Sequence, residues 1–421
     1  MIKAVRGAPD TLPPETTRWQ ALESAARTVL QRYGYAEIRT PIFERTELFV
    51  RGIGEGTDIV DKEMYTFDDR GGDSLTLRPE ATASVMRAYL EHGLAAKSSL
   101  TKLYLIGPMF RHERPQSGRF RQFHQLNVEA VGSPGPAIDA EVIALAEALL
   151  GRWGLPGVQL RINSIGDPAC RPAYRQAFVA YLAARRSELC DDCRVRLEKN
   201  PLRILDCKQA GCQAIATGAP TISGFLCEPC REHFTAVRAY LDALAIRYSV
   251  DERLVRGLDY YTRTTFEFLN PGLGAQNAVA GGGRYDGLIE ELGGAPTPSI
   301  GFAIGLERIL VSLAAPTEAA EPEGGAYIAT AGLGVSAALQ LAEAVRRRGV
   351  RAGLDLEGRS LKAQLRQANK ERFRYAVILG EAELARGQVT LKDMRGGEQR
   401  EVPRDGLTDY LAGLPEGEAA E

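Results

Sequence analysis

A polar loop between two strand-like stretches carries the densest set of side chains that could do chemistry. It lies within Phe110 to Glu129 and contains Gly118. In the second stretch, the two-residue period of a strand places one set of side chains on one face: Phe123, Gln125, Asn127 and Glu129. Three arginines lie close in sequence: Arg111, Arg119 and Arg121. Because guanidinium groups bind phosphate oxygens and an aromatic ring stacks on a base, this pattern predicts a cradle for a purine triphosphate. A solvated charged hairpin is the alternative.

A second segment, Leu254 to Thr264, places Tyr260 and Tyr261 beside Arg256 and Asp259 on a glycine-containing turn. It offers hydroxyls and charges to a ligand. A structural pair of Arg256 with Asp259, beside tyrosines of the core, is the alternative.

Two glycine-containing segments follow. Ala280 to Gly287 holds three consecutive glycines, which allow a ligand to approach the backbone. The segment matches neither a dinucleotide fingerprint nor a P-loop, because the required spacing and the Gly-Lys-Ser/Thr ending are missing. In Gly301 to Leu310 a short apolar strand runs into a helix with Arg308 in its first turn. A cation is disfavoured there without an anionic partner, which is either a ligand or a carboxylate such as Glu307.

The cysteines are concentrated. Six of the seven lie between Cys190 and Cys230, as two C-x2-C pairs and one C-x4-C pair. The two C-x2-C pairs predict a structural zinc site with four ligands: Cys190, Cys193, Cys227 and Cys230. Small core residues are the alternative.

The elements that must position these groups are read from periodicity. Helices are expected over 15–33 and 82–92, and strands over 36–40, 75–78, 103–106, 120–131, 264–269 and 276–280. Without a steady alternation of strands and helices, this pattern favours an α+β antiparallel sheet covered by helices. Residues 168–248 are rich in helix, cysteine and arginine and are expected to form an inserted helical domain. The catalytic domain would then comprise 1–167 and 249–318.

A stretch of linker composition, 314–325, precedes a separate α/β domain expected over 326–421. In 345–375, ten Lys or Arg residues face three acidic ones, a local charge of +7 that suits RNA phosphate. A solvated basic helix face is the alternative. The whole chain is nearly neutral, with 52 basic and 54 acidic residues, which excludes a wholly basic binder. No run of 18 apolar residues and no secretion signal are found, so we expect a cytoplasmic protein without a membrane partner.

Five segments in this order resemble class II aminoacyl-tRNA synthetases, and the histidyl-tRNA synthetase family in particular. Gly34 to Phe43 resembles motif 1, Phe110 to Phe123 motif 2 and Gly301 to Leu310 motif 3. Leu254 to Thr264 and Ala280 to Leu288 resemble the two peptides specific to the histidyl family. The resemblance covers nearly the whole chain. It implies an antiparallel catalytic domain, a helical insertion, a C-terminal anticodon-binding domain and a homodimer.

The resemblance also implies roles for single residues. It assigns ATP, with Mg²⁺ on its β and γ phosphates, to one set: Arg111, Glu113, Arg119, Phe123 and Arg308. Within that set, Arg111 would hold the α-phosphate and Arg119 the γ-phosphate. It assigns L-histidine to a second set: Glu80, Thr82, Gln125, Glu129, Tyr260 and Tyr261. Arg256 would be the catalytic cation of adenylation. Ala81 departs from the usual Glu-Gly-Thr, which matters only if that position needs a positive φ.

The implied activity is attachment of histidine to tRNA(His) through a histidyl-adenylate. Three rivals are weighed against it: the synthetase-like regulatory subunit of ATP phosphoribosyltransferase, a class II synthetase of other specificity, and a pure RNA-binding module. The regulatory subunit is disfavoured by the presence of Arg256, Arg308 and the C-terminal domain. A synthetase of other specificity is disfavoured by the peptide from Arg256 to Tyr261. A pure RNA-binding module would not need the set of arginines.

Overall fold

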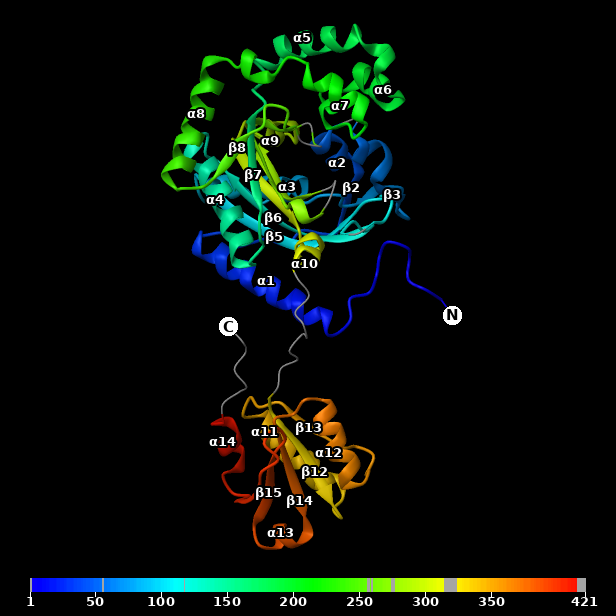
Figure 1. Ribbon diagram of the computed structural model, residues 1–421, viewed down its shortest axis with the longest axis vertical. Helices are drawn as coiled ribbons and strands as arrows, with labels where there is room; N and C mark the ends of the chain where they lie inside the picture. Colours follow the sequence, from blue (N-terminus) through cyan, green and yellow to red (C-terminus); the bar gives the residue numbers. More distant parts are fainter. Residues whose placement is uncertain are drawn as a thin grey trace. The chain divides into compact units, whose positions relative to one another are not determined.

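The computed structural model describes residues 2–54, 57–116, 118–255, 258, 260–273, 277–313 and 324–414. The chain divides into two compact units, residues 1–314 and 315–421, each with its own hydrophobic core (Figure 1). None of the described helices is both long enough and apolar enough to span a bilayer.

An eight-stranded sheet organises the first unit, in the order β1-β5-β6-β11-β10-β9-β7-β8. Its strands are β1 (Ala36–Glu37), β5 (Thr101–Phe110), β6 (Gln122–Val131), β7 (Gln159–Ser164), β8 (Tyr248–Val250), β9 (Thr262–Leu269), β10 (Ala278–Arg284) and β11 (Ser299–Gly305). All neighbouring pairs are antiparallel except the two at the edges, β1 with β5 and β7 with β8. The expected antiparallel sheet is therefore present, with parallel pairing at both edges.

The two faces of this sheet have different tasks. Leu126, Val128 and Ala130 of β6 point into the main core, with α1 (Glu15–Arg32), α4 (Pro136–Arg152) and α8 (Glu228–Ala243). The alternating residues of β6 point to the opposite face, where α3 (Thr82–Glu91) packs. The face toward α1, α4 and α8 thus packs in the main core, and the opposite face can carry a binding site.

A buried ion cluster ties three of these elements together. The Arg284 guanidinium at the end of β10 donates to both carboxylate oxygens of Asp139 on α4, and Asp139 also binds His233 Nε2 of α8 at 2.8 Å. Arg284 and Asp139 side chains are fully buried. A charge buried in this way stays in the fold only because it is paired.

A small sheet lies beside the large one. It has the order β2-β4-β3, from β2 (Phe43–Arg45), β3 (Tyr65–Asp68) and β4 (Ser74–Leu77). Helix α2 (Thr46–Ile53), the π-helix Ile59–Glu63 and α9 (Leu288–Glu291) accompany it, and a short 3-10 turn, Leu94–Ala96, follows α3. Strand β4 leads directly into Glu80 and α3, so this sheet sets the start of that helix.

The insertion forms a small helical body with a core of its own. It contains α5 (Arg171–Ala183), α6 (Asp191–Lys199) and α7 (Ala210–Thr217), with 3-10 turns at Arg186–Glu188, Pro201–Asp206 and Ile222–Phe225. Figure 1 shows α5, α6 and α7 gathered at the end of the first unit away from α1. Helix α8, which the expected boundary at 248 also includes, instead buries Val237 and Leu241 in the main core.

The second unit is a five-stranded sheet in the order β13-β12-β14-β15-β16. Its strands are β12 (Ala326–Ala331), β13 (Ala352–Leu354), β14 (Tyr375–Gly380), β15 (Gln388–Asp393) and β16 (Gln399–Pro403), and its helices α11 (Val335–Arg346), α12 (Leu361–Lys370), α13 (Glu381–Ala385) and α14 (Leu407–Ala412). The expected α/β domain is present here. Strand β12 pairs in parallel with β13 and β14, and the last two strands add in antiparallel fashion.

Candidate active site

One cavity opens on the face of the large sheet opposite α1, α4 and α8. Ten of the twelve predicted site residues line it: Glu80, Thr82, Arg111, Glu113, Arg119, Phe123, Gln125, Tyr260, Tyr261 and Arg308. Glu129 lies beneath the cavity, as described below. The twelfth, Arg256, lies outside the described residues, as do Gly257 and Asp259. The fold therefore brings together side chains from segments more than 200 residues apart, such as Glu80 and Arg308.

The cationic end of the cavity is built on strands β5 and β6 and the loop between them. The Arg111 guanidinium lies 5.4 Å from the Phe123 ring centre, and its Nε donates to the Pro79 carbonyl at 2.8 Å. Arg119 Nη1 donates to the Glu113 carboxylate at 2.7 Å. Because Arg111 and Phe123 are in a cation–π contact, a flat ring and a guanidinium group lie side by side in the cavity.

Arg308 enters from α10 (Leu306–Ser312), which follows β11 directly. The Glu307 carboxylate, its alternative partner, accepts the backbone N–H of His124 at 2.8 Å and contacts the His124 ring at 3.1 Å. Burial lowers the pKa of Arg308, and the neighbouring Arg119 lowers it further. Two cations facing one partly buried cavity favour an anionic ligand there.

The carboxylate end begins at α3. Glu80 accepts the backbone N–H groups of Thr82 at 2.7 Å and Ala83 at 2.9 Å, so its side chain caps that helix. Burial nevertheless raises the pKa of Glu80, against the effect of these hydrogen bonds. Ala81 has φ −107°, an ordinary backbone that any residue adopts. The departure from glycine at Ala81 is therefore harmless.

Glu129 lies under the cavity and is 1% exposed. The Thr82 hydroxyl donates to one carboxylate oxygen at 2.7 Å, and the Tyr285 hydroxyl donates to the other. Gly301 is its cross-strand neighbour on β11, and a Cβ there would overlap the carboxylate. Burial raises the pKa of Glu129 to about 8, although both hydroxyls oppose the shift. The group is thus poised to hold or release a proton near neutral pH.

Two amide oxygens remain without partners on the cavity wall. Within the described part of the chain, neither Gln125 Oε1 nor Asn127 Oδ1 has a hydrogen-bond partner, and both residues line the cavity. A buried acceptor without a partner costs free energy unless a ligand supplies a donor. These oxygens suit an ammonium or N–H group of a bound molecule.

The tyrosines form a cluster behind the carboxylates. The Tyr260 ring centre lies 4.7 Å from that of Tyr261 and 5.4 Å from that of Tyr285. Burial raises the pKa of Tyr260 and of Tyr285 well above the ordinary value, so both phenols stay protonated donors. Of the glycines in β10, Gly281 lines the cavity, whereas Gly282 and Gly283 leave no room for a Cβ against β11 and β9.

Glu267 and Tyr285 also line the cavity and were not among the predicted site residues, whereas Asn127 was predicted to lie on this strand face but was given no role. The period of two that groups Phe123, Gln125 and Glu129 also places Asn127 on this face, and Asn127 does line the cavity. Tyr285 follows directly after Arg284 in the glycine segment, but nothing in its local sequence reveals that its hydroxyl reaches Glu129.

The predicted zinc quartet is wrong in its grouping. The first C-x2-C pair lies with Cys207 and Cys212, and the second pair lies with Cys170 and Asp167. The two pairs begin different helices, α6 and α8, and sequence spacing cannot tell which partners tertiary packing brings to each.

Known proteins match both units. The family model described as "Histidyl-tRNA synthetase" matches residues 7–168 and 213–309, and the model described as "Anticodon binding domain" matches residues 328–414. The histidine–tRNA ligase of Moorella thermoacetica is 54% identical over 414 residues, covering 98% of each chain. That of Desulforamulus reducens is 55% identical over 407 residues, covering 94% of this chain and 96% of the relative.

Solved structures agree with these matches. The crystal structure of apo S. aureus histidyl-tRNA synthetase has a TM-score of 0.83 and 38% identity, covering 98% of this chain and 100% of that one. A Bacillus halodurans structure titled as an ATP phosphoribosyltransferase regulatory subunit/histidyl-tRNA synthetase has a TM-score of 0.65 at 22% identity, which is a likeness of fold alone. The regulatory-subunit alternative is therefore less supported. With a matching family model over more than half its length and full-length relatives above 50% identity, the chain belongs to the histidyl-tRNA synthetase family.

Proposed function

We propose that this chain attaches L-histidine to tRNA(His) in two steps, through a histidyl-adenylate. One observation carries the proposal: the guanidinium groups of Arg111, Arg119 and Arg308 share a cavity with an amide and carboxylate wall. The guanidinium groups can bind a triphosphate, and the amide and carboxylate side chains can bind the ammonium and imidazole groups of histidine. ATP and histidine would meet between them.

The nucleotide would bind at the cationic end. Arg111 would hold the α-phosphate and Arg119 the γ-phosphate, while adenine lies between the Phe123 ring and Arg308. The Arg119 guanidinium is held by Glu113 at 2.7 Å. The triphosphate would compete for Arg119, and Glu113 would be released toward the base or the metal.

Mg²⁺ would accompany the triphosphate. The carboxylates of Glu113 and Glu267 line the cavity, and hard oxygen ligands are those that this ion prefers. The ion would neutralise charge on the β and γ phosphates and so ease the departure of pyrophosphate.

Histidine would bind at the carboxylate end. Its α-ammonium would be held by Glu80 and the unpartnered Gln125 oxygen, beside the Thr82 hydroxyl. Its imidazole would lie over Glu129, against Tyr260 and Tyr261. A pocket that requires buried hydrogen bonds rejects analogues that lack them by a factor on the order of 10⁴.

The chemistry needs no covalent enzyme intermediate. The histidine carboxylate attacks the α-phosphorus, the bond to the β-phosphate oxygen breaks, and pyrophosphate leaves. Negative charge on the phosphoryl oxygens would be stabilised by Arg111 and Arg256. A hydroxyl at the tRNA 3′ end then attacks the adenylate carbonyl, AMP leaves, and the hydroxyl proton goes to the departing phosphate.

The C-terminal unit would bind the anticodon region of tRNA(His). A homodimer and a cytoplasmic location remain predictions. The homodimer would be tested by light scattering of the full chain.

Histidine-dependent exchange of labelled pyrophosphate into ATP tests the proposal. Of a panel of amino acids, only histidine should support exchange. Arg256→Ala should lower the exchange rate by about 10²–10³-fold, as loss of one aimed charge donor does elsewhere, while histidine and ATP still bind. Arg186→Ala, an exposed arginine paired with Glu198, is the control and should exchange normally. Exchange near the wild-type rate in Arg256→Ala would refute the role of Arg256, and exchange with another amino acid would refute the specificity.

A further inference from the structure

All seven cysteines of the chain lie in two clusters of four donors each. Cys190, Cys193, Cys207 and Cys212 form the first, and Cys170, Cys227 and Cys230 join Asp167 in the second. In each cluster the donor atoms lie within 4.8 Å of one another, and all seven thiols are free. Cysteines that only filled a core would have no reason to meet in sets of four.

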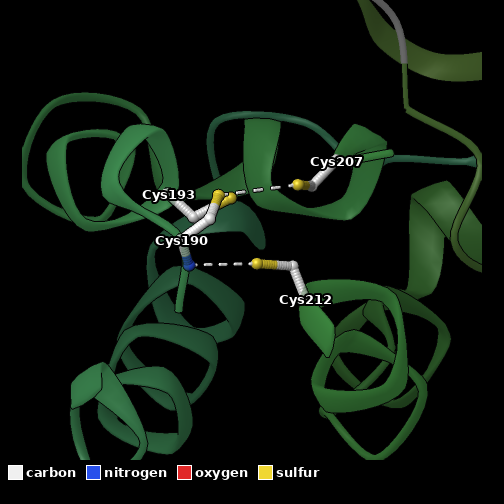
Figure 2. A group of neighbouring side chains, drawn as sticks. All are labelled: Cys190, Cys193, Cys207 and Cys212. Carbon is white, nitrogen blue, oxygen red and sulfur yellow. Dashed lines mark hydrogen bonds between the residues drawn. The ribbon is translucent and has the colours of Figure 1, made fainter. Parts of the chain in front are cut away.

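The first cluster has the dimensions of a metal site. Figure 2 shows the four side chains directed toward one another from α6, α7 and the turn between them. The Cys190 and Cys207 sulfurs are 3.9 Å apart. A tetrahedral zinc with Zn–S bonds of about 2.3 Å requires sulfurs about 3.8 Å apart. A disulfide bond instead requires about 2.05 Å.

The backbone around the cluster directs N–H groups at two of its sulfurs. Cys190 precedes the first residue of α6 and Cys193 lies in its first turn, at the positive end of the helix dipole. The Cys190 N–H donates to the Cys212 sulfur at 3.3 Å, and the Gln209 N–H donates to the Cys207 sulfur at 3.5 Å. Hydrogen bonds of this kind orient metal ligands from outside the coordination sphere.

The insertion has a physical need for a cross-link. Its helices α6 and α7 have nine and eight residues, and cysteines themselves make up part of its small core. Bodies this small gain much of their stability from disulfides or metals. From α6 and the following turn, Arg196 and Arg203 bind Asp58 of the catalytic domain at 3.0 and 3.3 Å. A cross-link here would therefore also hold the insertion against the part of the catalytic domain around Asp58.

We infer that Cys190, Cys193, Cys207 and Cys212 bind one structural Zn²⁺. Each thiol gives up its proton on binding, so four protons leave as four Zn–S bonds form. Four soft sulfur ligands in a tetrahedron select zinc or an iron–sulfur cluster. The site lies beside the recess that also holds Arg119 and Arg308, but it contributes no ligand to the predicted substrates.

The second cluster repeats the arrangement at another helix. Cys227 precedes α8 and Cys230 lies in its first turn, while Cys170 precedes α5. The Cys170 and Cys230 sulfurs are 4.0 Å apart, and Asp167 Oδ1 lies 3.4 Å from the Cys170 sulfur and 3.7 Å from the Cys227 sulfur. This geometry assigns a second Zn²⁺, with three thiolates and one carboxylate. It would join the insertion to α8 and hence to the main core.

Metal analysis of the full chain, purified in reducing buffer without chelator, tests both sites. We expect about two zinc ions per chain by mass spectrometry. Cys193→Ser should lose one, Cys230→Ser should lose one, and the double variant should lose both. Leu197→Ala is the matched control, because Leu197 packs in the same small core without offering a ligand, so that variant should keep both ions.

A measurement on the unaltered chain covers the case in which the variants do not fold. Cobalt(II) added to chelator-treated protein should give the visible absorption of tetrahedral thiolate coordination, displaced by zinc. Metal-free wild-type protein with no cobalt spectrum would overturn the inference. If the wild-type chain holds only one zinc ion, and if Cys193→Ser loses it while Cys230→Ser retains it, the second site alone is overturned. Iron with a brown chromophore, or thiols recovered as disulfides, would overturn the choice of zinc.

Discussion

Glu129 is a carboxyl group with no access to water, held by two hydroxyls and close to a second buried acid, Glu80. Burial raises its pKa to about 8, so below that pH the empty site keeps it protonated. A protonated carboxyl group cannot accept an imidazole N–H on its protonated oxygen. We predict that the imidazole N–H of neutral histidine binds to the ionised carboxylate, so that binding expels the Glu129 proton.

About one proton should be released per histidine bound at pH 7, and this release should fall toward zero as the pH rises past 8. A proton is released and not taken up, because the pKa of Glu129 is raised in the empty site whereas the complex holds the ionised carboxylate. Calorimetric titration in buffers of different ionisation enthalpy measures the release. Glu129→Gln, which has no proton to lose, should abolish the buffer dependence. Equal heats in all buffers for the wild-type chain would contradict the proton balance.

The sequence alone predicts which side chains lie together in the site when they belong to one strand. It does not predict this when they come from different elements. Phe123, Gln125 and Glu129 were found together because a strand repeats every two residues. The hydroxyl of Tyr285 was missed, since its partner lies 156 positions away and only the fold brings them together. A local pattern singled out Arg308, as a cation in the first turn of a helix, but only the resemblance pointed to Glu80.

At the scale of elements, periodicity predicted helices α1 and α3, whereas α2 and α4 were missed. Helix α1 begins at the expected residue and ends within one residue of the expected end. Helix α4 was not predicted, because buried residues occupy most of its circumference and leave little amphipathic period. The buried cluster of Arg284 with Asp139 was missed for the related reason that α4 itself was missing.

That cluster predicts a large stability effect. Asp139→Ala leaves Arg284 and His233 buried without their anion, so it should lower the free energy of unfolding of the first unit by about 3–5 kcal/mol. Asp286→Ala removes a partner of the same Arg284 whose side chain is 30% exposed, and it should lower the free energy of unfolding by about 1 kcal/mol. Tryptophan fluorescence during urea unfolding measures both, because the two tryptophans, Trp19 and Trp153, lie in the first unit. Equal midpoints for the two variants would refute the argument.

At the scale of the whole molecule, composition found the break between the two units and the strand-poor insertion. It overestimated the basic surface of the second unit. Arg347, Arg348 and Arg374 are paired with Glu343, Asp409 and Asp393, which all lie outside the sequence window in which the charge was counted. Linear charge counting misses such partners, because they are brought in by the fold.

Other basic residues of the same window form a row of cations on one helix. Lys362, Arg366 and Lys370 recur every four residues along α12, are exposed, and make no ion pair among the residues that the structure describes. If this row contacts tRNA phosphates, changing all three to Ala should weaken tRNA binding on the order of 50-fold at about 0.15 M salt. The slope of log affinity against log salt should also fall by about 2.

Histidine-dependent pyrophosphate exchange should stay normal in this triple variant, because the cavity proposed for adenylation lies in the other unit. A control of equal charge removes three exposed arginines of the same unit, Arg386, Arg400 and Arg404. Filter binding of tRNA across a salt series compares the two. Equal weakening in both would mean that net charge alone attracts the tRNA, whereas loss confined to the α12 variant would identify that helix as the RNA-binding face.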